Sequence, residues 1–198
     1  MRDAKSTLRH AVLNQLTVLD FSVADVSLSE KAKWDLKKHI RLISLLISYE
    51  ELFLGIERSL FFQEVSLVET CEILRDIHAP ELKSKKVKLE IKGEDLHLKV
   101  DRRMFQAGLE QLLLRIVSLS KEVILEAGKN ELRLLYKGEE LPEPTSQDMA
   151  DILNDYGNQV ELLGYYLGLH LLELNGIKVE MSKGEVVLNF PKNLVVKK

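Results

Sequence analysis

The sequence predicts an α+β protein, with a helical hairpin at its N-terminus and an α/β sandwich after it. Two observations lead to this prediction. In the first 60 residues, apolar side chains recur every three or four positions, which is the spacing of amphipathic helices. After Pro80, short segments of alternating apolar and polar residues, typical of half-buried strands, are interleaved with helical segments. This order predicts helices on one face of a mixed sheet.

The first helix is predicted over residues 3–26. Its apolar stripe has the spacing of a bundle helix and consists of Leu8, Val12, Leu16, Leu19, Val23 and Val26. His10 points away from this stripe, and Asn14 and Thr17 follow His10 along the same face at intervals of about one turn. The helix is therefore expected to present an imidazole, within a polar row, to solvent or to a partner.

A second helix is predicted to start at the capping box Ser27-Leu28-Ser29-Glu30, which makes a hairpin. It carries two apolar stripes. One is expected to pack on the first helix and comprises Leu36, Ile40, Ile43, Ile47 and Leu54. The other has no mate within one hairpin and comprises Leu42, Leu46, Tyr49 and Phe53. We therefore expect two chains to close a four-helix bundle, and packing of the second stripe on the C-terminal domain is the alternative.

The remaining elements follow from caps and periodicity. The capping box Ser66-Leu67-Val68-Glu69 opens a helix expected to run to about Ala79-Pro80. Strands are expected at 87–91 and 96–100 on either side of Gly93, at 122–126 and 131–136 as a hairpin, and at 177–182 and 185–190. Helices are expected at 104–119, 147–154 and 159–174. The predicted domains are residues 1–60 and 61–198.

Composition narrows the classes of function. The chain has 28 basic and 31 acidic residues and shows no concentrated basic stripe, so nucleic-acid binding is not expected. No apolar run approaches the ~18 residues that cross a bilayer, and no secretory signal is visible, so no membrane insertion is expected. A single Cys71 fits the reducing cytoplasm. The other histidines lack paired metal-ligand spacing, so no metal site is expected at His39, His78, His97 or His170.

The segment that begins at His10 resembles the phospho-acceptor helix of bacterial sensor histidine kinases, whose pattern is H-E-x-x-N/T-P-L-T-x-I. His10, Asn14, Leu16 and Thr17 match the pattern, whereas its acid and its proline are replaced by Ala11 and Gln15. Three further segments resemble the aspartate-led N-box helix and the G-x-G-L-G-L and H-G-G segments of the same family, namely 101–104, 164–169 and 174–176. The resemblance implies a GHKL, or Bergerat-type, ATPase fold for the second domain.

The residues that bind nucleotide in that family are replaced, so the resemblance is to a degenerate domain. The N-box asparagine that holds Mg²⁺ corresponds to Arg115, whose guanidinium only donates hydrogen bonds and would repel the cation. The aspartate that reads adenine corresponds to Tyr136. Tyr165 and Tyr166 replace the small residues that let the backbone approach the phosphates in that family. Glu139 and Glu140 place negative charge near where a triphosphate would lie. We therefore expect no ATP binding and no cofactor.

An acceptor histidine kept beside a degenerate ATPase domain resembles the dimeric histidine phosphotransferases of phosphorelays. The resemblance implies that His10 accepts a phosphoryl group from the aspartate of one response-regulator receiver domain and passes it to another, with Mg²⁺ on the receiver only. Asn14 is a candidate for orienting that group. Candidates for contact with the receiver are Thr17, Lys37, Lys38 and Arg41. A second copy of the chain and a sensor kinase are the other expected partners.

Other interpretations stay open. Asn14 and the basic residues of the second helix are also ordinary features of a solvated helix face. A non-catalytic pseudokinase adaptor that binds response regulators or kinases would need no chemistry at His10. An ATP-dependent kinase with an aberrant pocket would bind ATP at micromolar concentration. With Met1 only nine residues before His10, no upstream sensor domain is expected.

Overall fold

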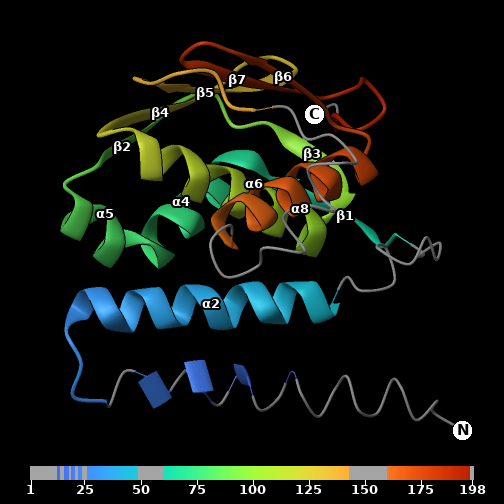
Figure 1. Ribbon diagram of the computed structural model, residues 1–198. Coiled ribbons are helices and arrows are strands. Elements are labelled where there is room, and N and C mark those ends of the chain that lie inside the picture. The colour runs from blue at the N-terminus through green and yellow to red at the C-terminus, as the bar shows by residue number, and fades with distance from the viewer. Residues whose placement is uncertain are drawn as a thin grey trace, which may run out of the picture. The chain divides into compact units, whose positions relative to one another are not determined.

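The computed structural model describes residues 13, 16, 17, 19, 20, 22, 23, 26–48, 60–142 and 160–196. The chain divides into two compact units, Met1–Ser59 and Leu60–Lys198. The described part of the first unit contains helices and the segment 26–29 that connects them, and the second unit contains helices and two sheets (Figure 1).

The first unit holds the two helices of the predicted hairpin. Residues 13, 16, 17, 19, 20 and 22 are helical, and helix α2 spans Glu30–Ser48. Val26 lies in a bend, so the first helix ends before the predicted limit. The cap of α2 is Ser29 rather than Ser27: its Oγ accepts a hydrogen bond from the Ala32 N–H at 3.2 Å. The Ser29 carbonyl also accepts the first intrahelical bond, from Lys33 N at 2.9 Å, which sets the start of the helix.

Apolar exposure on the hairpin differs from the prediction. In the stripe expected to pack on the first helix, Ile40 is buried, whereas Leu36 and Ile43 are 43% and 37% exposed. In the stripe of the first helix, Val23 is buried, whereas Leu19 and Val26 are exposed. Leu42, from the other predicted stripe of α2, is also buried. Each predicted stripe therefore holds both buried and exposed side chains, or is described only in part. The side chain of Leu46 is not described. Five other members of the predicted stripes lie outside the described residues, namely Leu8, Val12, Tyr49, Phe53 and Leu54.

A five-stranded mixed sheet forms one layer of the second unit, in the order β2-β4-β5-β7-β6. Its strands are β2 (Lys88–Gly93), β4 (Glu122–Ala127), β5 (Glu131–Tyr136), β6 (Lys178–Ser182) and β7 (Glu185–Asn189). β2 runs parallel to β4, and the other neighbours are antiparallel. The predicted hairpin of β4 with β5 is confirmed. The two strands predicted at 177–182 and 185–190 are present as β6 and β7, and they pair with each other.

A two-stranded sheet pairs β1 (Phe62–Ser66) with β3 (His97–Asp101), with Val65 opposite Leu98. β1 was not predicted, because Val65 is its only buried side chain and no alternation is visible. The strands predicted on either side of Gly93 are confirmed as β2 and β3, but they enter different sheets. Gly93 has a φ of 96°, and a Cβ there would lie 2.0 Å from the Ala127 carbonyl oxygen, so only glycine fits this end of β2.

Helices cover one face of the five-stranded sheet: α4 (Leu67–Ile77), α5 (Ala79–Lys85), α6 (Arg102–Leu119) and α8 (Val160–Leu174) (Figure 1). The predicted cap of α4 is confirmed, since Ser66 Oγ accepts from Glu69 N at 3.0 Å. α4 ends earlier than predicted, and Pro80 opens α5 instead of ending α4, because proline is tolerated in a first helical turn. The predicted helix at 147–154 lies outside the described residues.

Helices α6 and α8 pack at very close range. A Cβ on Gly108 would lie 2.9 Å from the Gly168 carbonyl oxygen, and one on Gly168 would lie 3.0 Å from the Gly108 carbonyl oxygen. Backbone atoms cannot move aside as a flexible side chain can, so both positions require glycine. The close approach holds α6 and α8 as one layer, and these helices carry Arg115, Tyr165 and Tyr166.

Candidate functional site

The candidate acceptor His10 and its neighbour Asn14 lie outside the described residues. Thr17, the third member of the predicted polar row, is helical and exposed. Its Oγ1 donates a hydrogen bond to the Leu13 carbonyl oxygen at 2.9 Å. The Thr17 proton is thus used inside its own helix, and the hydroxyl oxygen is left as an acceptor toward solvent.

The basic residues of α2 do not behave alike. Lys37 is half-buried. Lys38 lies on the same helix, and its side chain is not among those that the structure describes. Arg41 reaches across the hairpin: its Nε lies 3.9 Å from Asp20 Oδ2, and both side chains are partly exposed. Arg41 therefore ties α2 to the first helix, and an acidic partner would have to compete with Asp20 for it.

Arg115 lies on α6 and is half-buried. Its Nε is enclosed and has no hydrogen-bond partner among the described residues. One turn earlier on the same helix, the Cβ of Gln111 lies against Gly168 of α8. A guanidinium has no lone pair for a cation, so the donor set at this position does not fit the Mg²⁺ that accompanies a bound triphosphate.

Tyr136 closes the turn that follows β5. Its ring is buried, and its hydroxyl donates to the Glu139 carbonyl oxygen at 2.8 Å. Burial, together with the nearby Glu140 carboxylate, raises the pKa of the Tyr136 phenol, so it stays neutral at physiological pH. The Tyr136 hydroxyl is therefore already used within its own turn. Glu139 and Glu140 themselves are exposed.

The glycine-containing segment that begins at Gly164 lies inside α8 and is not a loop. Tyr165 is fully buried, and its hydroxyl lies 3.0 Å from both the Pro142 carbonyl oxygen and Met181 Sδ. Tyr166 is also buried, with the two ring centroids 5.3 Å apart. The rings are part of the core, so this segment is a packed helix.

Asn175, in the segment 174–176, has a structural role that the sequence did not reveal. It is buried, its Oδ1 accepts from the Asp101 N–H at 2.7 Å, and its Nδ2 donates to the Leu171 carbonyl oxygen at 2.9 Å. Asp101 in turn caps α6, since its Oδ1 accepts from Met104 N at 3.1 Å. Asn175 thereby joins the end of α8 to the start of α6, which accounts for an asparagine at this point of the motif.

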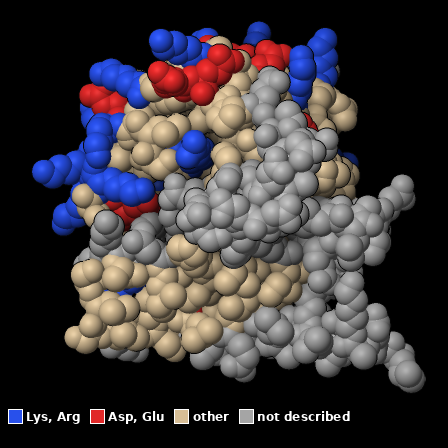
Figure 2. Space-filling view, viewed as in Figure 1, with Lys and Arg blue, Asp and Glu red and all other residues tan. Residues whose placement is uncertain are grey.

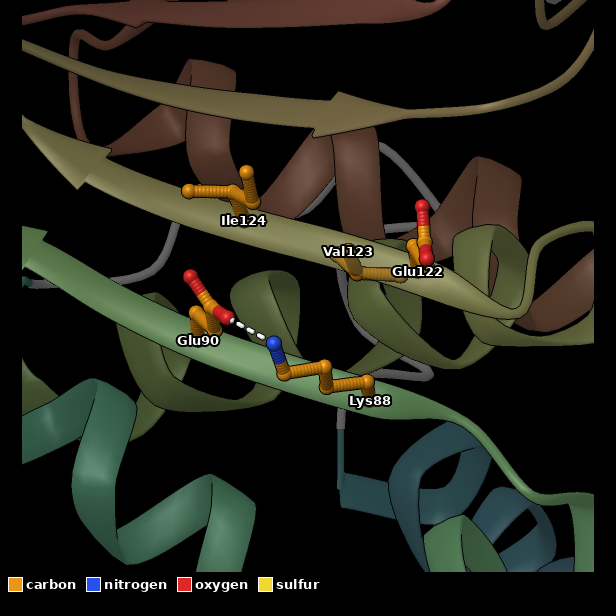
Figure 3. Close-up of a pocket in the computed structure, with 5 residues that line it drawn as sticks. All are labelled: Lys88, Glu90, Glu122, Val123 and Ile124. Atoms are coloured by element: carbon orange, nitrogen blue, oxygen red, sulfur yellow. Dashed lines mark ion pairs between the residues drawn. The ribbon is translucent and has the colours of Figure 1, made fainter.

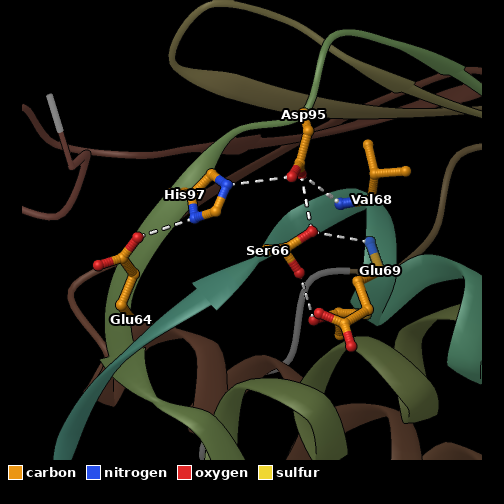
Figure 4. Close-up of polar contacts among 7 residues, drawn as sticks. Glu64, Ser66, Val68, Glu69, Asp95 and His97 are labelled. Carbon is orange, nitrogen blue, oxygen red and sulfur yellow. Dashed lines mark hydrogen bonds and ion pairs between the residues drawn. The ribbon is translucent and has the colours of Figure 1, made fainter. Parts of the chain in front are cut away.

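The histidines described in the second unit include two with polar contacts that join its elements. His97 on β3 has Nδ1 2.9 Å from Glu64 Oε1 and Nε2 3.2 Å from Asp95 Oδ2 (Figure 4). Asp95 also accepts from Ser66 Oγ at 2.9 Å, which connects this network to the cap of α4 (Figure 4). His78 is buried, with Nε2 2.9 Å from a Glu110 carboxylate oxygen on α6.

No protein-family model matches the sequence, and no curated protein matches it. Solved structures do match. Full-length ShkA in complex with AMPPNP has a TM-score of 0.61 and 16% identity, covering 98% of this chain and 46% of that one. The Acinetobacter baumannii histidine kinase AdeS has a TM-score of 0.58 and 14% identity, covering 96% of each chain. The cytoplasmic segment of histidine kinase QseC has a TM-score of 0.57 and 12% identity, covering 75% of this chain and 92% of that one.

At sequence identities of 12% to 16%, the similarity to these structures shows a shared fold. The chain has the α+β fold of the histidine kinase catalytic core, and the predicted fold class is confirmed. The match to AdeS extends over nearly all of both chains, whereas the chain spans about half the length of ShkA. None of the helices in the described part of the chain is long and apolar enough to cross a membrane.

Proposed function

We propose that this protein is a phosphorelay histidine phosphotransferase of two-component signalling, which accepts a phosphoryl group on His10 from one receiver domain and passes it to another without binding ATP. The main support is Arg115, a donor-only side chain that the sequence resemblance aligns with the Mg²⁺-binding asparagine of the family. Tyr136, Tyr165 and Tyr166 support the same interpretation, because the resemblance aligns them with nucleotide-binding positions and their rings are buried in the core of this chain.

The chemistry requires little from this chain. A neutral imidazole nitrogen of His10 attacks the phosphorus of the aspartyl phosphate, an N–P bond forms, and the acyl P–O bond breaks to release the aspartate carboxylate. The reverse sequence on a second receiver regenerates the imidazole. The receiver supplies the Mg²⁺ and the cation that neutralise the charge on the transferring group. Asn14 is proposed to orient the phosphoryl group. The residues proposed to contact the receiver are Thr17, Lys37, Lys38 and Arg41.

Ala11 favours a second candidate function. The kinase pattern has an acid directly after the histidine, and this chain has none. If His10 is not labelled by any phosphorylated receiver while receivers still bind, the protein is a pseudokinase adaptor that binds response regulators or kinases without chemistry.

The proposal includes a homodimer formed through the hairpin. Among the described residues of the first unit, the large apolar side chains that are 37% to 52% exposed are Leu19, Val26, Leu28, Leu36 and Ile43. A second copy would cover such side chains in a four-helix bundle. We expect light scattering to report a dimer at micromolar concentration, and Ile43→Asp to shift it to monomer because an unpaired carboxylate is costly in an apolar interface. Glu30→Lys, at the start of the same helix, is the control. A monomeric unmodified chain contradicts the dimer.

Isothermal titration with Mg-ATP tests the nucleotide part of the proposal. We expect no measurable binding of ATP or ADP at high protein concentration, because Arg115 repels the cation on which the triphosphate depends. A dissociation constant below about 100 μM, or roughly −5.5 kcal/mol, contradicts this and favours an ATP-dependent kinase.

A further inference from the structure

Five lysines gather at one corner of the second unit, where α5 ends and β2 and β4 begin. They are Lys83, Lys85, Lys86, Lys88 and Lys121, and we call them the lysine corner. In Figure 2 basic side chains are concentrated on the left, over the region that Figure 1 labels α5 and β2. The chain as a whole is acidic, with a net charge of −3, so this is a local segregation of charge.

Backbone contacts hold the corner together. Lys121 Nζ donates to the Lys85 carbonyl oxygen at 2.7 Å, and Lys88 N donates to the Lys121 carbonyl oxygen at 2.8 Å. Lys85 pairs with Glu81 and Lys88 with Glu90. The other three lysines have no carboxylate partner among the described residues, so the corner keeps an excess of positive charge.

Lys86 stands in a backbone conformation that favours glycine. Its φ is 55°, and the Val87 N–H donates to the Leu82 carbonyl oxygen at 2.8 Å, as in a Schellman turn. Among the described residues it is the one non-glycine with a positive φ. Glycine would make this turn with less strain, so a lysine here adds charge at the expense of stability.

A hollow of about 150 Å³ lies beside the corner, over the paired first residues of β2 and β4 (Figure 3). Its lining residues are Lys88, Glu90, Glu122, Val123 and Ile124. Lys88 therefore belongs to both the corner and the hollow, and Ile124 offers an apolar surface beside it (Figure 3). Hydrogen bonds from Lys88 and Lys92 lower the pKa of Glu90 to about 2, so this border carboxylate stays ionised.

We propose that the lysine corner and the adjoining hollow dock an acidic segment of a partner protein, whose carboxylates meet Lys83, Lys86 and Lys121 while one apolar side chain rests on Ile124. Glu90 and Glu122 border the site and would be repelled by a uniformly anionic surface such as a membrane or a nucleic acid. A protein segment has discrete carboxylates that avoid them. The inference does not depend on chemistry at His10.

NMR titration of the ¹⁵N-labelled full chain with the capped peptide Glu-Glu-Leu-Glu-Asp tests the inference. At low salt we expect weak binding, with a dissociation constant on the order of 1 mM or lower. The changes in amide chemical shift should be confined to residues 83–92 and 121–124. The triple variant Lys83→Glu, Lys86→Glu, Lys121→Glu should weaken binding by about tenfold or more. A control with the same charge change at Lys129, Lys183 and Lys192 should stay within about twofold.

Lys86→Gly separates binding from folding. We expect it to raise the midpoint of urea unfolding, because the left-handed strain is relieved, and at the same time to weaken peptide binding. Equal binding by the triple variant and its control overturns the inference, as does equal binding of the capped peptide Gln-Gln-Leu-Gln-Asn. Tighter binding of phosphatidylglycerol vesicles or of a single-stranded oligonucleotide at the same residues overturns it as well.

Discussion

Replacing His10 by alanine is expected to abolish transfer of a phosphoryl group from a phosphorylated receiver domain, with a loss of about a thousandfold or more in rate. The proposed chemistry has a single nucleophile in this chain, so no other side chain can take over the step. Receiver affinity is expected to stay within a few fold, because a solvated side chain contributes little to uniform binding. The measurement is transfer of labelled phosphate from receiver to chain, followed by receiver binding.

His170→Ala is the matched control. His170 is an exposed histidine on α8, near Glu173, and its loss should leave transfer unchanged. Label that persists in His10→Ala as an acid-labile, base-stable adduct would show that another histidine is the acceptor.

Lys37→Glu is a cleaner test of receiver docking than Arg41→Glu, since Arg41→Glu also places like charge against Asp20 within the hairpin.

Gly168→Val is expected to lower the free energy of unfolding of the second unit by about 3 kcal/mol or more. A Cβ at this position would lie 2.8 Å from the Gln111 Cβ and 3.0 Å from the Gly108 carbonyl oxygen. Relieving those contacts requires α6 and α8 to move apart, which opens the core between them. Urea unfolding of the full chain measures the effect.

Glu173→Val places the same β-branched side chain at an exposed position of α8, and we expect it to cost less than about 1 kcal/mol. A loss at Gly168 no larger than this control would mean that α6 and α8 do not pack at close range. A large loss at Gly168 alone supports the packing that gives this domain its rigid layer.

Elements with strong local signals were predicted well from the sequence. Ser66 and Asp101 each satisfy a helix N–H three residues later, so the starts of α4 and α6 were visible in short motifs. β1 and α5 were missed, since β1 has a single buried side chain and Pro80 is read as a stop as readily as a start. Burial in a sheet edge depends on distant segments, which a local pattern does not report.

The candidate site shows the same division. The loss of nucleotide binding stays a prediction, which rests on the resemblance that aligns Arg115 and Tyr136 with family positions and on what these side chains can donate or accept. The Asp20 partner of Arg41 was not predicted, since it lies on the opposite helix of the hairpin. The lysine corner was also missed: the sheet brings Lys121 to the end of α5, and the sequence alone shows no concentrated basic stripe.

Parallel labelling with two phosphoryl donors tests the proposed function most directly. The purified chain is incubated with Mg²⁺ and γ-labelled ATP in one reaction, and with Mg²⁺ and a labelled phospho-receiver from the same cell in the other. We expect label on His10 from the receiver and none from ATP. Label from ATP would contradict the loss of nucleotide binding, and no label from any receiver of that cell would contradict phosphotransfer by His10.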